Sequence, residues 1–230
     1  KKHQGRGGKP IRNSTIRHEF FSLSQCLQTA VECGALIENP CSLLSLKKVL
    51  PNDTQRRERI LSAEEFQRLL DACERHLKIF VSLAWVTACR MGEILQLEWD
   101  DIDLEHEKIT FRHSPPMRRT KNKKTRSVSV TKEFLEFLIE NHPRVENSTW
   151  VFSHPDGTRI KNVKTGIKLA TKRAELKDVT AHTIRHSVNS ALLHGGFSQT
   201  VVRDHVGHSD FRMTSHYAHT QEQEQRAAAK

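Results

Sequence analysis

The stretch LKIFVSLAWVTACRMGE, residues 77–93, decides the fold. Its residues up to Cys89 are predominantly apolar, which is typical of a helix at the centre of a domain. Arg90 follows at the end of this run, and Glu93 lies three positions further on. An arginine beside so many apolar residues is unfavourable unless it is paired with an acid or has a functional role. We therefore expect Arg90 at the edge of a helical core, oriented by Glu93.

Helices are expected on both sides of this stretch. Upstream, Ser62 and Glu65 form a capping-box pattern that predicts the start of a helix with a buried apolar stripe. Downstream, Thr131 is suited to cap a helix over 132–141, and the periodicity of the later sequence predicts helices over 161–176, 183–194 and 199–206. A last helix is expected to carry Tyr217, the only tyrosine in the chain.

Three short segments have the character of strands. KITF (108–111) and RSVSV (126–130) show the β-branched alternation of a hairpin, and WVF (150–152) precedes an Asp156–Gly157 turn. The expected fold class is therefore mainly α with a small β-sheet, an α+β domain.

The N-terminal part forms a separate region. Residues 13–34 have helical periodicity, with possible N-caps at Asn13, Ser14 and Thr15 and a stop at Gly34. Residues 51–60 are polar, charged and without periodicity, as in an interdomain linker. We expect a partial helical domain over 1–50, a linker over 51–60 and a second domain over 61–230, because fifty residues are too few for an independent core.

The charge balance favours a polyanionic partner. The chain has 37 Lys and Arg against 27 Asp and Glu, a formal net charge of +10. The excess gathers in residues 1–12 and in MRRTKNKKTR (117–126), so nucleic acid is the first candidate partner. A solvated basic surface is the alternative for each run.

Hydropathy and cysteine content limit the class of protein further. There is no apolar run long enough to span a membrane and no signal-peptide pattern, so we expect a soluble, intracellular protein. The five cysteines are odd in number and lack CxxC spacing, which favours reduced, buried thiols.

The fourteen histidines raise the question of a metal. His182 and His186 have the spacing of HExxH, but Thr183 stands where that motif needs glutamate, and Arg185 would place a cation beside the metal. HxxH pairs at His205 and His216 lack accompanying cysteines or carboxylates. We expect no metal site.

A phosphate is the alternative ligand. His182 and Arg185 lie on one face of the expected helix, so both can point at one anion. For each residue alone a surface salt bridge is the competing interpretation. A lysine-bearing hairpin, a second arginine and a lone tyrosine in the same chain favour a shared phosphate site.

Four motifs then resemble one family. TACRMGEILQLEWDDID (87–103), TKNKKTRSVSV (120–130), AHTIRHS (181–187) and VGHSDFRMTSHYAH (206–219) are similar, in order and context, to the motifs of the tyrosine recombinase (phage integrase) family. The resemblance covers about 61–220, which implies a catalytic domain over 61–230. It also implies that the region over 1–50 is the last part of a helical core-binding domain.

Position by position, the resemblance implies an active site made of six residues: Arg90, Lys121, His182, Arg185, His208 and Tyr217. Lys123 and Lys124 remain alternatives to Lys121. Ala88 and Val206 depart from the family's usual glycine and leucine.

The resemblance implies a site-specific DNA recombinase that acts through a 3′-phosphotyrosyl intermediate without a cofactor, to integrate or excise a phage or other mobile element. The implied partners are double-stranded DNA, three further copies in a tetramer on DNA, and accessory proteins, in the bacterial cytoplasm and not at a membrane. The alternatives are a type IB topoisomerase and a non-catalytic DNA-binding protein. Additional DNA contacts are expected from residues 1–12 and 118–126 and from a basic face that comprises Arg159, Lys161, Lys164, Lys168, Lys172 and Arg173.

Overall fold

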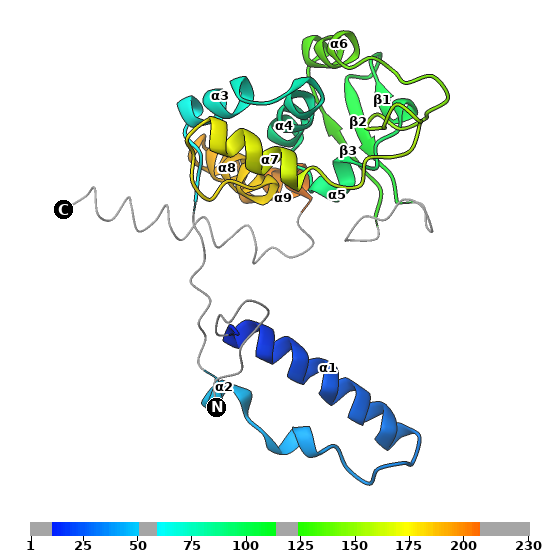
Figure 1. The fold of residues 1–230 in the computed structure, drawn as a ribbon, viewed down its shortest axis with the longest axis vertical. Helices are drawn as coiled ribbons and strands as arrows, with labels where there is room; N and C mark the ends of the chain where they lie inside the picture. Colours follow the sequence, from blue (N-terminus) through cyan, green and yellow to red (C-terminus); the bar gives the residue numbers. More distant parts are fainter. Residues whose placement is uncertain (1–10, 51–58, 114–123, 208–230) are drawn as a thin grey trace, which may run out of the picture. The chain divides into compact units, whose positions relative to one another are not determined.

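The computed structural model describes residues 11–50, 59–113 and 124–207. The chain divides into two compact units, 1–58 and 59–230, and both are drawn in Figure 1. Within the described ranges, no helix has both the length and the apolar character needed to cross a membrane.

Within residues 11–50, the first unit contains a long helix and two short ones. These are α1 (Asn13–Glu32), the 3-10 helix η1 (Pro40–Leu43) and α2 (Leu46–Val49). Gly34, at φ 73°, ends α1 as expected, but the helix begins at Asn13 after Arg12 and has no side-chain N-cap. Asn39 joins η1 to α1, because its Nδ2 donates to the Ser24 carbonyl at 2.9 Å. No residue of α1 is buried, in keeping with a unit too small for its own core.

The helices of the second unit are α3 (Ala63–Asp71), α4 (Arg75–Thr87), α5 (Met91–Ile94), the 3-10 helix η2 (Trp99–Asp101), α6 (Lys132–Asn141), α7 (Lys164–Arg173), α8 (Ala181–His194) and α9 (Gln199–Val206). The capping box of Ser62 and Glu65 is present, and Thr131 Oγ1 accepts from the Phe134 amide. The predicted starts of α3 and α6 are thus confirmed. The expected last helix lies outside the described residues.

Three antiparallel strands form one small sheet in the order β1 (Ile102–Asp103), β2 (Lys108–Phe111), β3 (Arg126–Ser129). Ile109 pairs with Val128, and Phe111 pairs with Arg126. Figure 1 shows the sheet at one side of this unit, with α3, α4, α7 and α8 gathered at the other side. The mainly α fold with a small sheet is confirmed.

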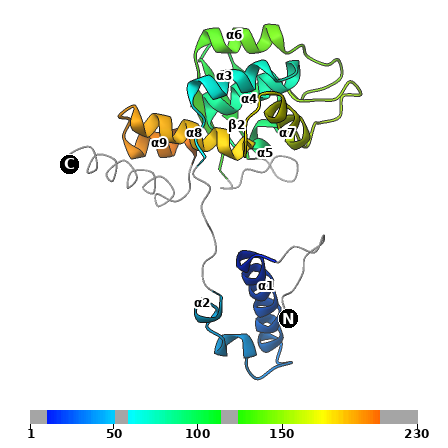
Figure 2. The ribbon, with the colours of Figure 1, turned by 60° about the vertical axis from the view of Figure 1, so that its left-hand side comes forward.

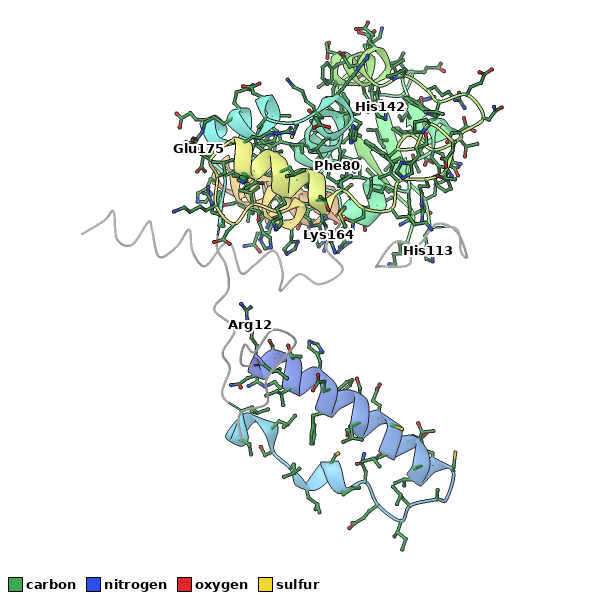
Figure 3. All side chains as sticks on the ribbon, in the orientation of Figure 1. Arg12, Phe80, His113, His142, Lys164 and Glu175 are labelled. Atoms are coloured by element: carbon green, nitrogen blue, oxygen red, sulfur yellow. The ribbon has the colours of Figure 1, made fainter. Side chains whose placement is uncertain are left out.

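The core forms around α4. Phe80, fully buried, packs edge-on against Phe152 with 5.8 Å between ring centroids, and Figure 3 shows it in the interior of the second unit. Figure 2 shows the same unit turned, with α9 lying next to α8. A buried central helix is the outcome expected from the apolar run 77–89.

The strand expected over 150–152 is wrong. Trp150 forms only an isolated bridge with Glu98, while the Val151 amide donates to the Leu97 carbonyl at 2.9 Å. Val151 and Phe152 are both buried, so the apolar run reflects burial in the core rather than a strand in the sheet.

The cysteines are only partly as expected. All five are free. Cys41 and Cys89 are buried, but Cys26 and Cys33 are exposed, because α1 has no buried face in which to place them. The expectation of buried thiols is therefore wrong for these two.

Candidate active site

A sharp turn places Arg90 at the edge of the core. Helix α4 ends because Ala88 takes the left-handed conformation, with φ 49°, and Arg90 stands directly before α5. Glu93 then lies one turn into that short helix. Its Oε1 is 2.7 Å from Arg90 Nη1, and its Oε2 accepts from the Arg90 amide at 3.1 Å. The prediction that Glu93 orients Arg90 is confirmed.

Arg185 reaches the same place from α8. Its side chain is buried, and Nη1 donates to the Ala88 carbonyl at 2.5 Å and to the Val206 carbonyl at 2.8 Å. Its Nη2 is buried and has no hydrogen-bond partner among the residues that the structure describes. Burial, followed by the charge of Arg90, lowers the pKa of Arg185 to about 10, so the side chain stays charged at neutral pH. A buried donor of this kind calls for an acceptor.

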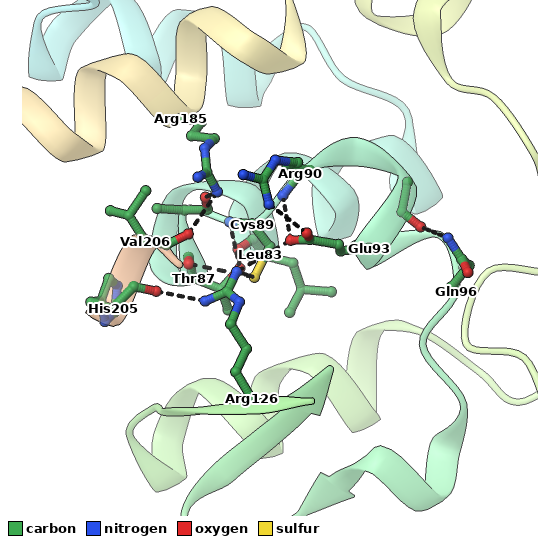
Figure 4. Close-up of polar contacts among 12 residues, drawn as sticks. Leu83, Thr87, Cys89, Arg90, Glu93, Gln96, Arg126, Arg185, His205 and Val206 are labelled. Atoms are coloured by element: carbon green, nitrogen blue, oxygen red, sulfur yellow. Dashed lines mark hydrogen bonds and ion pairs between the residues drawn. The ribbon is translucent and has the colours of Figure 1, made fainter. Parts of the chain in front are cut away.

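Arg126 is the third arginine of the cluster, shown in Figure 4. From the start of β3, its Nη2 lies 3.2 Å from Glu93 Oε2. The cluster thus combines three guanidinium groups with the carboxylate of Glu93. Burial alone would raise the pKa of Glu93, but the charge of Arg126 and the hydrogen bond from Arg90 outweigh it and lower the pKa. An ionised Glu93 leaves an excess of positive charge that suits an anion.

His182 and His186 lie one turn apart on α8. The two Nε2 atoms are 2.7 Å apart, so one ring donates and the other accepts. Burial, with smaller contributions from His182 and Arg185, lowers the pKa of His186 to about 4. His182 is exposed. Its ring is thus held by a neutral partner at the surface of α8.

The other three predicted residues, Lys121, His208 and Tyr217, lie outside the described residues, as do the alternative Lys123 and most of the basic run 117–126. Lys124 is described and exposed, and it lies shortly before the start of β3. Gly207, the residue before His208, ends α9. The structure therefore brings Arg90 and Arg185 together and describes the chain on either side of the lysine hairpin.

Arg126 is the residue that sequence reasoning missed, because it was grouped with the phosphate-contacting hairpin 118–126. That expectation is wrong for this side chain, which contacts Glu93, Cys89 and the His205 carbonyl. One signal was available: Arg126 shares the strand face of Val128 and Val130, both buried. An arginine in phase with buried valines faces the interior.

The metal hypothesis finds no cluster to support it. Within 11–50, 59–113 and 124–207, no three His, Cys, Asp or Glu side chains group in a way that could hold an ion. His205 instead hydrogen-bonds the Val86 carbonyl, at 3.1 Å from its Nε2.

The phage integrase family model matches residues 59–224. The chain belongs to the phage integrase family. This integrase-family chain is 30% identical over 218 residues to the shufflon-specific DNA recombinase of Escherichia coli, covering 93% of this chain and 53% of that protein. It is 28% identical over 227 residues to the ICEBs1 integrase of Bacillus subtilis (strain 168), covering 89% and 61% respectively.

The fold has solved counterparts. The Tn1549 transposon integrase, solved in complex with transposon right end DNA, superposes with a TM-score of 0.74 at 19% identity. The match covers 95% of this chain and 80% of that one. Our integrase-family chain spans between half and two thirds of the length of the two curated relatives.

Proposed function

We propose that the chain is a site-specific DNA recombinase that cleaves and rejoins strands through a 3′-phosphotyrosyl intermediate, integrating or excising a mobile element. One observation carries the proposal: the buried Nη2 of Arg185 has no acceptor within the described ranges, and Arg90 lies at the same cluster. The non-bridging oxygens of a phosphodiester would supply that acceptor.

The arginines provide charge stabilisation. Attack on a phosphodiester builds negative charge on the non-bridging oxygens, and a planar guanidinium presents paired donors to them. Glu93 holds Arg90 in place, and the Ala88 and Val206 carbonyls hold Arg185, so neither side chain must reorganise during the reaction. Each such preorganised donor typically contributes about 100- to 1,000-fold in rate.

Tyr217 is the proposed nucleophile. Its phenolic oxygen forms a bond to phosphorus while the bond from phosphorus to the 5′ oxygen breaks. The phenol has a pKa of about 10, so its proton must be accepted, and His182 is the proposed acceptor. The proposed donor to the departing 5′ oxygen is Lys121, with Lys123 and Lys124 as alternatives. His208 is proposed to hydrogen-bond a phosphate oxygen.

The relatives support DNA as substrate, since the E. coli relative is a DNA recombinase and the Tn1549 integrase was solved with DNA. We propose double-stranded DNA bound by a catalytic domain over 61–230, a linker over 51–60 and part of a core-binding domain over 1–50. We further propose a tetramer on DNA, assisted by accessory proteins, acting in the cytoplasm where that DNA is found.

The test is trapping of the covalent intermediate. Nicked duplexes that tile the DNA flanking this gene are incubated with wild-type chain and with Tyr217→Phe. Wild type forms a covalent adduct and Tyr217→Phe does not. An adduct that persists in Tyr217→Phe removes the nucleophile assignment.

Further variants decide the remaining roles. Single changes of Lys121, Lys123 and Lys124 to alanine identify the lysine, because only one of them should abolish cleavage. Relaxation of supercoiled plasmid without any specific site would instead indicate a type IB topoisomerase. Binding without any adduct would indicate a non-catalytic DNA-binding protein.

A further inference from the structure

Arg126 is a half-buried arginine that has no role in the proposed reaction. Its side chain is 17% exposed, and its guanidinium carbon lies 5.2 Å from the centroid of the Phe111 ring. A guanidinium buried to this extent destabilises the fold unless it is paired. Its partners therefore show what it does.

Those partners come from three separate segments of the chain. Nη2 lies 2.8 Å from Cys89 Sγ in the turn after α4 and 3.2 Å from Glu93 Oε2 in α5. Nη1 donates to the His205 carbonyl in the last turn of α9 at 2.7 Å. One rigid guanidinium thus joins β3, the Arg90 turn and the end of α9, as Figure 4 shows.

The contact with α9 is tight. Gly207, which follows α9 in the left-handed conformation at φ 72°, approaches Arg126 so closely that a Cβ there would lie 2.6 Å from Arg126 Nε. The carbonyl end of a helix also carries partial negative charge, which a cation stabilises. His208 follows Gly207 directly in the sequence, so Arg126 fixes the end of the last described helix before His208.

On its other side, the Arg126 guanidinium contacts the Arg90–Glu93 pair. Glu93 uses both oxygens, with Oε1 on Arg90 and Oε2 on Arg126. Its side chain is only 4% exposed. The buried carboxylate therefore fixes the distance between the arginine proposed to bind phosphate and the arginine that holds α9.

We propose that Arg126 is a positioning residue, which locks the end of α9, the last described helix before Tyr217 in the sequence, to the Arg90–Glu93 pair. The proposal rests on the proposed function. Arg126 does not touch the substrate. It sets where the nucleophile's segment begins relative to the arginines that hold the phosphate.

The experiment compares Arg126→Met and Arg126→Lys with Lys108→Met, a matched control. Lys108 lies on the neighbouring strand, is 39% exposed and contacts Asp103 at 3.5 Å, so its loss removes one charge without touching α9. Adduct formation on the nicked duplexes is measured at rising DNA concentration. Arg126→Met should lower the rate at saturating DNA by about 100-fold, the cost of about 1 Å of misplacement. The DNA concentration at half-maximal rate should match that of the control.

Arg126→Lys should restore little of the rate, because one ammonium is not a planar fork that reaches Glu93 and the His205 carbonyl together. Cleavage by Arg126→Met at the control rate would overturn the proposal. Full rescue by Arg126→Lys would also overturn it, since a charge alone would then suffice.

A second substrate distinguishes an effect of Arg126 on the segment that carries Tyr217 from an effect on the lysine hairpin. A duplex with a bridging 5′ sulfur in place of oxygen has a leaving group that needs no proton, so it should rescue Lys121→Ala. It should not rescue Arg126→Met. Rescue of Arg126→Met would assign Arg126 to the hairpin and refute our proposal.

Hydrogen exchange provides a readout that needs no DNA, so failure of the proposed function is recognised separately. The Gly207 amide bonds the Arg203 carbonyl at 2.7 Å. In Arg126→Met this amide and the last turn of α9 should exchange at least several-fold faster, with α8 unchanged. Unchanged exchange at the end of α9 would refute the lock even if no substrate is ever cleaved.

Discussion

Glu93 is the residue on which the arginine cluster depends. It is buried, and it contacts Arg90 and Arg126 through separate oxygens. A buried carboxylate between two guanidiniums is held ionised, and removing its charge leaves two cations facing each other in a poorly solvated place. The carboxylate thus lets three guanidinium groups gather around it.

Glu93→Gln should destabilise the second unit by about 3–5 kcal/mol at neutral pH, because it breaks a buried pair from one side. The pKa of Glu93 is lowered in the fold, so the carboxylate contributes stability above its ordinary value of 4.5 and loses it as the pH falls below that value. Denaturant unfolding of both proteins from pH 7 to pH 3 measures the difference, which should shrink at the acid end.

Glu136→Gln is the matched control for this change. Glu136 is 48% exposed and 3.9 Å from Lys132, so its substitution should cost about 0–1 kcal/mol. Equal costs for Glu93→Gln and Glu136→Gln would contradict the role assigned to Glu93.

His186 gives a pH prediction of the same sign. Its pKa is lowered to about 4 from the ordinary 6.5, so the unfolded chain binds more protons between those values and stability falls as the pH drops through that range. His186→Gln should flatten the dependence of the melting temperature on pH between 6.5 and 4. Thermal unfolding at a series of pH values measures this, and an unchanged slope in His186→Gln would refute the assignment.

At the scale of elements, the cluster lies where the ends of several short elements meet. The turn after α4, the start of β3 and the last turn of α9 each contribute a backbone carbonyl or a side chain. Ends of elements carry unsatisfied carbonyls, and Arg126 and Arg185 satisfy those of His205 and Val206. Arg126 and Arg185 thus both cap the end of α9.

Two glycines with similar backbones test this contact. Gly207 and Gly196 both have positive φ, of 72° and 83°, but a Cβ at Gly196 would meet nothing within 4 Å. Each alanine substitution should cost about 1–3 kcal/mol for the left-handed conformation, and Gly207→Ala should cost more because of Arg126. In an Arg126→Met background the two costs, measured by denaturant unfolding, should become equal. A difference that persists there would mean that Arg126 is not the obstacle.

At the scale of the whole molecule, part of the net charge of +10 lies on helix α7. Lys164, Lys168 and Lys172 are each exposed and follow one another at four-residue spacing along that helix. Figure 3 shows Lys164 at the surface. Arg159, expected on the same basic face, is instead half-buried with its guanidinium carbon 5.0 Å from the centroid of the Trp150 ring.

We expect the α7 lysines to contact DNA phosphates. Changing all three to glutamine should make the plot of log affinity against log salt shallower by about 0.9 for each phosphate that is no longer neutralised, as measured by fluorescence anisotropy on a random duplex. The control changes Lys132, Arg144 and Lys177 to glutamine, since these side chains are exposed at other sites. If both sets of substitutions changed the slope equally, DNA binding would depend on the overall charge of the chain and not on the lysine face of α7.

The sequence alone determined most of the longer helices, the two longer strands and the family. Local periodicity and capping patterns depend on neighbours a few positions apart, so the helices α3, α6 and α9 and the two longer strands were predictable. The pairing of Arg90 with Glu93 was predictable for the same reason, since one helical turn separates them. The strand expected at 150–152 was wrong because burial and strand pairing give similar apolar runs.

Only the tertiary structure decided how the cluster is held. Arg126 meets Glu93 across 33 positions and His205 across 79, and Arg185 meets Ala88 across 97. No local spacing encodes these contacts, because they arise where separate elements pack and their free carbonyls and buried charges must be satisfied together. The sequence predicted that Glu93 orients Arg90, and the packing of distant segments placed Arg126 between Glu93 and the end of α9.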